Sequence, residues 1–281
     1  MAQTKLIKKI EEDPTLPFGG IPSKKNPNIT RILFINTNGL DLGTDSHSLN
    51  ELCSNCKSQQ YNILLLADTN THWKNKRTTD KFRNTIAKKW KGTSVTTSET
   101  NIPWHPAYKP SGTAIITNSL IRSRKTKSGE DNHGLGRWSF ITLQGRDGRK
   151  LTTISVYKVC STQIDHTKTN TALIQKSTVL RDSLEKESIA SLTITRLEIF
   201  ISKLTKLNYQ VLIGIDADEA FKSNAGDIAR LFKKCNLVDP ILTKHGTAGE
   251  PNTYARGSNR IDYFACTSKI YKYPLLYNHD L

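Results

Sequence analysis

The sequence lacks the features that would place it in a membrane or outside the cell. None of its apolar runs approaches the roughly 20 residues of a membrane-spanning helix, and the charged N-terminus MAQTKLIKKIEEDP has no apolar stretch typical of a signal peptide. The five cysteines are odd in number and scattered, which favours a reducing compartment over a disulfide framework. We therefore expect an intracellular protein of the nucleus or cytoplasm, neither secreted nor membrane-bound.

Several catalytic signatures are also missing. The chain has no Walker-type Gly-Lys-Ser/Thr loop, and the absence of His-Glu-x-x-His and Gly-x-Ser-x-Gly elements argues against zincins and α/β-hydrolases. Cys53 and Cys56 form a single Cys-x-x-Cys in a segment with a helical pattern. Because no second pair has zinc-ligand spacing, we interpret them as ordinary helix cysteines, with a metal or redox role as the alternative.

Acidic residues are the scarce charged type. Lys and Arg number 41 against 25 Asp and Glu, so the net charge is 41 − 25 = +16 and the pI is near 9.6. Such a surplus attracts polyanions, nucleic acid first and an anionic membrane surface second, although a generally basic surface has the same composition. The length of 281 residues suits one large α/β domain.

The pattern of apolar residues predicts a flexible basic leader over 1–29 and one domain over 30–281. Strands are predicted at 31–36, 61–67, 93–97, 113–117, 137–143, 151–158, 210–216 and 260–266. Helices are predicted at 46–58, 78–90, 170–206 with a break near Ser188–Ser191, and 226–236. The turn Gly145-Arg146-Asp147-Gly148 predicts a hairpin between two of the strands.

Carboxylates and amides follow the apolar runs where the predicted strands end. Asp68 follows LLLA, Asp216 and Asp218 follow VLIGI, and Asn36 ends RILFIN, while Asp262 lies in RIDYF. Strand ends of this kind converge on one cleft, and several oxygen ligands there suit a hard cation such as Mg²⁺.

Taken singly, most of these residues have an ordinary explanation. Asp68 suits a helix N-cap or turn, and Asn36 suits a turn leading to Asn38-Gly39. Asp216 and Asp218, two apart, either share one face of a strand or lie in a solvated turn. These alternatives stay open from the residues alone.

Two residues on strands have sharper alternatives. Asp262 lies inside an apolar strand, so its carboxylate needs a partner. The candidates are a metal, a histidine, or an arginine such as Arg260 or Arg256. Tyr157 closes the strand LTTISVY as a core or rim tyrosine, or as a group with hydroxyl chemistry.

The order of these segments resembles the endonuclease/exonuclease/phosphatase superfamily, which has the deoxyribonuclease-I-like fold. Asn36-Thr37-Asn38-Gly39-Leu40 matches its Asn-x-Asn-Gly-Leu, Ala67-Asp68-Thr69 its Gln-Glu-Thr, Val156-Tyr157 its Ala-Tyr, Ile215-Asp216-Ala217-Asp218 its Gly-Asp-Phe-Asn, and Arg260-Ile261-Asp262-Tyr263 its Arg-Ile-Asp-Tyr. The resemblance covers about residues 31–267. The sequence differs from the family pattern in having Asp68 where the family has Glu and Asp218 where it has Asn. It implies an α/β fold of two packed mixed sheets flanked by helices, a four-layer αββα sandwich.

The resemblance also implies roles for the residues. Asp68 would be the main ligand of Mg²⁺, or alternatively Mn²⁺, with Asn36 as an auxiliary. Asp216 would orient or deprotonate the attacking water, and Tyr157 would hydrogen-bond the scissile phosphate. Asp218 takes the place of an Asn that contacts the phosphate, and Asp262 would orient a histidine. Expected contacts to a nucleic-acid backbone are Lys74, Lys76, Arg77, Arg137, Lys158, Arg256 and Arg260. Trp73, Trp104 and Trp138 are available to stack on bases, although for Trp138 we favour a position in the core.

One departure concerns the end of the family pattern. The family finishes with Ser-Asp-His, whereas this sequence finishes Asn278-His279-Asp280-Leu281. Either the aspartate and the histidine are present in a different order, or the last core strand and the catalytic histidine are missing. We favour the second alternative, which would leave a weak or inactive enzyme.

Three functions follow as expectations. The first is a Mg²⁺-dependent phosphodiesterase, an endonuclease-like domain that nicks DNA, similar to those that retrotransposons carry beside a reverse transcriptase in a longer chain. The second is a non-catalytic nucleic-acid-binding relic of such an enzyme. The third is a phosphoesterase of the same fold on small or lipid phosphates, which the charge of +16 disfavours.

Overall fold

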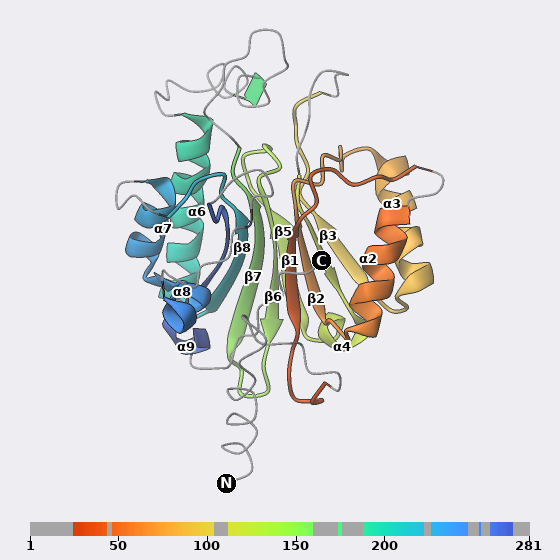
Figure 1. Ribbon diagram of the computed structural model, residues 1–281, viewed down its shortest axis with the longest axis horizontal. Helices are drawn as coiled ribbons and strands as arrows, with labels where there is room; N and C mark the ends of the chain where they lie inside the picture. Colours follow the sequence, from red (N-terminus) through yellow and green to blue (C-terminus); the bar gives the residue numbers. More distant parts are fainter. Residues whose placement is uncertain are drawn as a thin grey trace.

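Two β-sheets pack face to face between two layers of helices (Figure 1). The computed structural model describes residues 25–43, 47–103, 112–159, 174–175, 188–221, 226–246, 253 and 259–271. Within these ranges no helix is long and apolar enough to cross a membrane. The arrangement confirms the predicted αββα sandwich. The predicted leader before residue 25 and the expected loss of a last strand, which concerns 272–281, lie outside the described residues.

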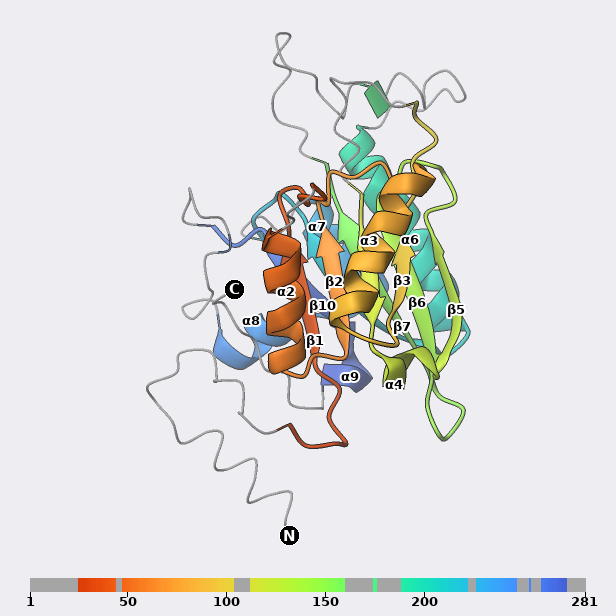
Figure 2. The ribbon, with the colours of Figure 1, turned by 90° about the vertical axis from the view of Figure 1, so that its right-hand side faces the viewer.

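The first sheet has the strand order β1-β2-β4-β3. Its strands are β1 (Ile32–Asn36), β2 (Ile63–Ala67), β3 (Ser94–Thr97) and β4 (Ala114–Thr117), and only the β1–β2 pair is parallel. Helices α2 (His47–Ser58) and α3 (Lys76–Lys89) cover its outer face, and the short α4 (Ser119–Arg122) follows β4 (Figures 1 and 2).

The second sheet has the order β5-β6-β7-β8-β10-β9. Its strands are β5 (Lys125–Glu130), β6 (Trp138–Gln144), β7 (Lys150–Tyr157), β8 (Gln210–Asp216), β9 (Leu237–Val238) and β10 (Asp262–Thr267). Helices α6 (Ile189–Lys206), α7 (Asp227–Cys235) and α8 (Pro240–His245) lie on its outer side, and α9 (Ser268–Tyr271) follows β10 (Figure 1). The hairpin predicted at Gly145–Gly148 joins β6 and β7.

The alternation of side chains along the strands builds three separate apolar layers. In β2, Leu64 and Leu66 face α2 and α3, whereas Ile63 and Leu65 pack between the two sheets. In β8, the residues on either side of Gly214 pack toward α6 and α7. Because both faces of these strands are covered, continuous apolar runs replace the alternating pattern of a half-exposed strand.

The two sheets are in close contact where Gly214 of β8 meets Phe34 of β1. A Cβ atom on residue 214 would lie 2.4 Å from Phe34 Cδ2 and 2.6 Å from Cγ, both inside van der Waals contact. Phe34 also packs edge-on against Phe264 of β10, with ring centroids 6.1 Å apart. Glycine at this position therefore sets how closely β1 can approach the second sheet.

Most predicted elements are present, but five short or polar ones were missed. The sequence KTKSGE forms β5, an edge strand without an alternating apolar pattern. Strand β9 has only two residues, and α4, α8 and α9 span only four to six residues. The predicted break near Ser188–Ser191 is the start of α6, where Ser188 caps the helix by accepting a hydrogen bond from the Ser191 backbone N–H. The part of the predicted helix over 176–187 lies outside the described residues.

An acidic group lies at the end of β5. The Glu130 carboxylate accepts a hydrogen bond from the Glu99 backbone N–H, and the carboxylates of Glu99 and Asp131 lie nearby. Burial raises the pKa of Glu130 to about 7, and the two neighbouring charges add to this against the opposing effect of the hydrogen bond. The folded protein therefore holds this proton more tightly than the unfolded chain does.

We predict that Gly214→Ala lowers the free energy of unfolding by about 1–3 kcal/mol, the usual cost of forcing an extra carbon into a packed core. Urea unfolding measures the change. In a double-mutant cycle, Phe34→Leu should recover part of the loss, because it removes ring atoms that the new methyl group would meet. Equal losses in both backgrounds would show that the close approach of the sheets is not the cause.

We predict that Glu130→Gln changes the pH dependence of stability. A carboxyl group with a raised pKa stabilises the fold below its unfolded pKa of 4.5, and this contribution is lost as the pH rises toward the folded value of about 7. The variant keeps a neutral side chain, so its melting temperature should exceed that of the wild type near pH 8 and match it near pH 4. An exposed glutamate, Glu51, serves as the control through Glu51→Gln, and a constant difference across this pH range would contradict the assignment.

Candidate active site

Three of the predicted site residues lie side by side across the second sheet. The register pairs Tyr157 of β7 with Asp216 of β8, and Asp216 with Asp262 of β10. Partners in register on neighbouring strands present their side chains to the same face. Residues up to about a hundred positions apart in the sequence are thus brought into one row at one end of the sheet.

The first sheet contributes Asn36, which joins this row across the gap between the sheets. Its Nδ2 donates to Asp216 Oδ2 at 2.8 Å, while its Oδ1 accepts from the Asn38 backbone N–H at 2.9 Å. Asn38 and Gly39 both have positive φ, of 43° and 97°, in the turn predicted for this dipeptide. The turn therefore fixes the amide so that its nitrogen faces the buried carboxylate.

Asp68 follows β2 and begins the loop that leads to α3. Its φ is 47°, in the left-handed region, and its carbonyl oxygen accepts from the Gly39 backbone N–H at 2.7 Å. This bond ties the loop after β2 to the turn after β1. The side chain is half-buried, and its charge acts on Asp216.

Asp218 lies beyond the strand, so of the two alternatives for this pair the exposed turn applies and the shared strand face does not. β8 ends at Asp216, and Asp218 has φ 49° and an exposed side chain. Its charge still contributes to the electrostatics of Asp216. Asp218 therefore lies at the rim of the row.

The four carboxylates repel one another. Asp216 is 3% exposed, and burial, followed by the charges of Asp262, Asp68 and Asp218, raises its pKa well above the ordinary value. Burial also raises the pKa of Asp262 to about 6, although a hydrogen bond from Thr253 and the charge of Arg260 act against this. Protons or a cation must balance such a group.

The chemistry of these side chains fits a divalent cation with oxygen ligands. The donors are carboxylates and an amide, the ligand types that Mg²⁺ prefers. The buried Oδ1 of Asp262 has no hydrogen-bond partner within the described residues. The same residues include no group of three or more His, Cys, Asp or Glu arranged closely enough to hold a metal ion. The fit is therefore one of charge and donor type, not of a closed ligand shell.

Three of the predicted phosphate contacts are buried, which corrects their assignment. Arg137 has 0% exposure, donates from Nε to Gln175 Oε1 at 2.8 Å, and lies over the Tyr157 ring at 5.3 Å. Lys158 Nζ pairs with Glu219 at 2.8 Å. Arg260 forms an ion pair with Asp239 at 2.8 Å, and Asp239 is the N-cap of α8, so the guanidinium helps to hold the start of that helix.

Three of the predicted cations remain at the surface. Lys74, Lys76 and Arg77 are exposed, and Lys74 Nζ donates to Asn101 Oδ1 at 3.4 Å. Trp73 and Trp138 are core residues, at 1% and 4% exposure, and do not present a stacking face. Arg256 and Trp104 lie outside the described residues.

Glu219 is a structural residue that the sequence did not single out. It accepts from Lys158 Nζ, its Oε1 accepts from the Ile228 backbone N–H at 3.4 Å, and its carbonyl oxygen accepts from Tyr263 Oη at 3.0 Å. These bonds hold the segment after Asp216 against α7 and β10. The sequence shows Glu219 three residues after Asp216, but it gives no signal that Lys158, Ile228 and Tyr263 are its hydrogen-bond partners.

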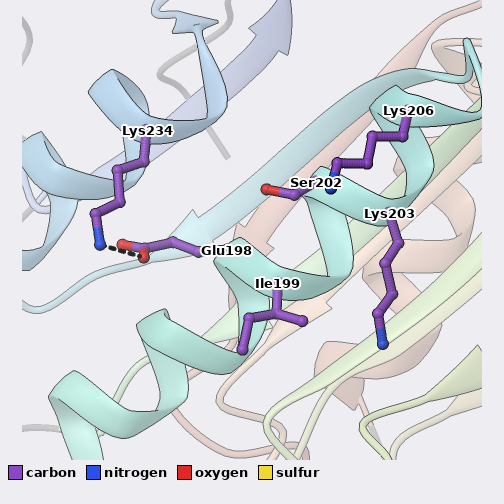
Figure 3. A pocket seen from close by; sticks show the side chains of 6 residues that line it. All are labelled: Glu198, Ile199, Ser202, Lys203, Lys206 and Lys234. Carbon is purple, nitrogen blue, oxygen red and sulfur yellow. Dashed lines mark hydrogen bonds and ion pairs between the residues drawn. The ribbon is translucent and has the colours of Figure 1, made fainter.

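A hollow of about 420 Å³ lies on the outer helices of the second sheet (Figure 3). Its lining residues are Glu198, Ile199, Ser202, Lys203, Lys206 and Lys234. Lys234 Nζ pairs with Glu198 at 3.3 Å, as the dashed line shows. None of the candidate site residues lines it, so we separate it from the row of carboxylates.

No protein-family model matches the chain, and no curated protein sequence matches it. Solved structures match it closely in fold. The AP endonuclease LMAP of Leishmania major has a TM-score of 0.60 at 14% identity, covering 87% of this chain and 80% of its own. An AP endonuclease of Archaeoglobus fulgidus has a TM-score of 0.56 at 15% identity, covering 87% and 89%.

A third similar structure is the catalytic domain of Xenopus laevis APE2, with a TM-score of 0.52 at 13% identity, covering 86% of this chain and 83% of its own. At such low identity these likenesses establish the fold. The sandwich topology, the order of the strand-end motifs and these structures agree. The chain therefore has the fold of the endonuclease/exonuclease/phosphatase superfamily.

Proposed function

We propose that the protein is a divalent-cation-dependent phosphodiesterase that nicks a nucleic-acid backbone, with DNA as the favoured substrate. The observation that carries the proposal is the meeting of Asn36 with Asp216 across the two sheets, beside Asp262 and Tyr157. A net charge of +16 favours a polyanion over a small phosphate. The similar AP endonucleases support a nuclease of this fold.

The roles follow from the surroundings of each side chain. Asp68 and Asn36 would hold Mg²⁺, since the Asn36 carbonyl oxygen keeps a second lone pair beside its bond to Asn38. When bound, such an ion polarises a phosphate oxygen and stabilises charge on the leaving oxygen. Asp216, buried and with a raised pKa, is suited to accept a proton from water.

Tyr157 and Asp262 complete the arrangement. The Tyr157 hydroxyl would donate to the scissile phosphate, and the Arg137 guanidinium lies over its ring in a cation–π contact, 5.3 Å from the centroid. The free Oδ1 of Asp262 would orient a proton donor, the place that a histidine takes in the family. The segments Gly136-Arg137-Trp138-Ser139 and Tyr157-Lys158-Val159-Cys160 support a domain of the retrotransposon kind, for which a reverse transcriptase domain is the natural partner.

A second candidate is a nucleic-acid-binding domain without catalysis. Asp218 favours this second candidate. It stands where the family pattern has an Asn that contacts the phosphate, and a carboxylate there would repel that phosphate. Within the described residues, the buried Oδ1 of Asp262 accepts no hydrogen bond, from a histidine or from any other group. Cleavage assays separate the two candidates.

We predict that the wild type nicks supercoiled plasmid in the presence of Mg²⁺ and that Asp216→Asn lowers the rate by roughly 10²–10³, the usual loss when one essential polar group is removed. Gel separation of supercoiled and nicked plasmid gives the rates. The control is Asp147→Asn in the β6–β7 turn, which should keep the wild-type rate. Equal nicking by wild type and Asp216→Asn would exclude catalysis at this site.

Binding of the cation has a readout of its own. Mg²⁺ should raise the melting temperature of the wild type, since a ligand that binds only the folded state stabilises it. The shift should shrink in Asp68→Asn, which loses one charge while keeping a residue type that tolerates positive φ. A shift without nicking would favour the second candidate.

We predict that Asp218→Asn raises the nicking rate or the affinity for DNA several-fold. The substitution removes a negative charge at the rim of the row, and Asn accepts the left-handed backbone at φ 49°. Plasmid nicking and fluorescence anisotropy with a labelled duplex measure the two effects. Because the effect is electrostatic, it should shrink as the salt concentration rises; a loss in both measurements would show that the Asp218 carboxylate itself is needed.

A further inference from the structure

Helix α3 carries an unusual surplus of positive charge. Six of its 14 residues are Lys or Arg and one is Asp. Exposed helix faces ordinarily mix charges of both signs, because pairs three or four residues apart stabilise the helix. α3 has few such pairs available.

The placement of these charges works against the helix itself. Its first turn contains Lys76 and Arg77 and no acid, although the N-terminal end of a helix favours negative charge. Arg77 and Lys81 are like charges four residues apart, which destabilises an isolated helix by a few tenths of a kcal/mol. Local stability therefore does not explain the pattern.

Among the residues that the structure describes, the cations of α3 have no close acid partner of the kind found in α7. Asp80 approaches Arg83 only at 4.0 Å, and Lys81 Nζ donates to the Gly43 carbonyl oxygen at 2.9 Å. In α7, by contrast, Arg230 pairs with Glu198 at 3.0 Å and with Asp227 at 3.1 Å. The charge of α3 is thus left for an external partner.

Three of these cations form a straight row. Arg77, Lys81 and Lys88 lie four and seven residues apart and are all exposed, on the face opposite the buried residues Phe82 and Ile86. With a rise of 1.5 Å per residue, they stand about 6 Å and 10.5 Å apart along the helix axis. A row with this spacing can follow the phosphates of one strand.

The row starts beside the candidate active site. The loop that begins with Asp68 leads into α3, and Trp73 in that loop is fixed by a hydrogen bond from Nε1 to Thr69 Oγ1 at 3.0 Å and by its contact with Phe82, with ring centroids 4.8 Å apart. Asn75 caps the helix by accepting from the Thr78 backbone N–H. The row therefore has a fixed position relative to Asp68.

From that start, α3 leads away from the candidate site. β2 ends at the site, whereas β3, which follows α3, begins with Ser94 opposite Thr117 at the other end of the sheet. Figure 2 shows α3 lying along the outer side of the first sheet. A nucleic acid held at the row of carboxylates must turn to follow it.

We propose that the row Arg77, Lys81 and Lys88 binds a single-stranded segment of nucleic acid that continues from the candidate active site along the outer face of α3. The inference rests on the proposed function for the site itself. A duplex, with a persistence length of about 150 base pairs, cannot turn from the strand ends onto the flank of the sandwich within a few base pairs. A single strand can, and binding to it is driven by backbone charge without base reading.

The test compares two probes in the Asp216→Asn background, which removes cleavage. One probe is a blunt DNA duplex, and the other is the same duplex with a thymidine tail long enough to span the roughly 21 Å of α3. The variant is Lys81→Gln/Lys88→Gln. The control is Lys203→Gln/Lys206→Gln, which removes the same charge from α6 on the opposite side of the sandwich (Figure 1).

We expect the α3 variant to weaken binding of the tailed probe and to reduce its slope of log K against log salt by about 1.4, or 0.7 for each lost contact to a single strand. Binding of the blunt duplex should stay unchanged. The control should change neither probe, because α6 lies beyond the screening length of about 10 Å from α3. Circular dichroism melting verifies that both variants are folded.

Two results would overturn the inference. Equal weakening of the blunt and tailed probes would assign α3 to duplex, and equal effects of the α3 and α6 variants would assign the binding to net charge alone. The proposed function is tested separately by plasmid nicking. Tail binding that depends on Lys81 and Lys88 in a protein that does not nick would leave the surface established and the catalytic proposal refuted.

Discussion

The hydrogen bond from Asn36 to Asp216 depends on how closely the two sheets approach. Each residue ends a strand of a different sheet, and they meet only because β1 packs against β8 where Gly214 has no side chain. A wider spacing would leave Asp216 with repelling carboxylates and no amide donor. The packing of the core and the chemistry of the site are therefore one constraint.

This constraint gives the protein a negative centre inside a positive surface. The net charge is +16, yet Asp216, Asp262, Asp68 and Asp218 act on one another at the strand ends. The buried cations nearby form their ion pairs with other acids, Lys158 with Glu219 and Arg260 with Asp239, although the charge of Arg260 still acts on Asp262. Such a centre attracts cations, while the surface attracts polyanions, and a phosphodiester with a metal ion satisfies both.

The sequence was informative where the physics is local. Continuous apolar runs predicted the buried strands. The polar residues at the ends of two such runs selected Asn36 and Asp216, and a carboxylate inside an apolar strand selected Asp262; the fold brings all three together. The prediction that Lys158 contacts a phosphate failed, because Lys158 is buried against Glu219, which lies 61 residues away in the sequence. The sequence pattern also failed for β5, because an edge strand needs no apolar alternation. Long-range pairing decides whether a cation is buried, and no local pattern encodes it.

The polar residues at the strand ends have two possible reasons, the backbone conformation and the charge of the site, and local backbone geometry distinguishes them. Asn38, Asp68, Asn70 and Asp218 all have positive φ, between 43° and 49°. Asn and Asp are the residue types, after glycine, that tolerate this region, because their short side chains hydrogen-bond locally. An exchange between Asn and Asp at these positions therefore carries little conformational cost, and its cost is electrostatic. The backbone at position 218 therefore accommodates an acid or an amide equally well, and only the charge of a bound phosphate would oppose the acid.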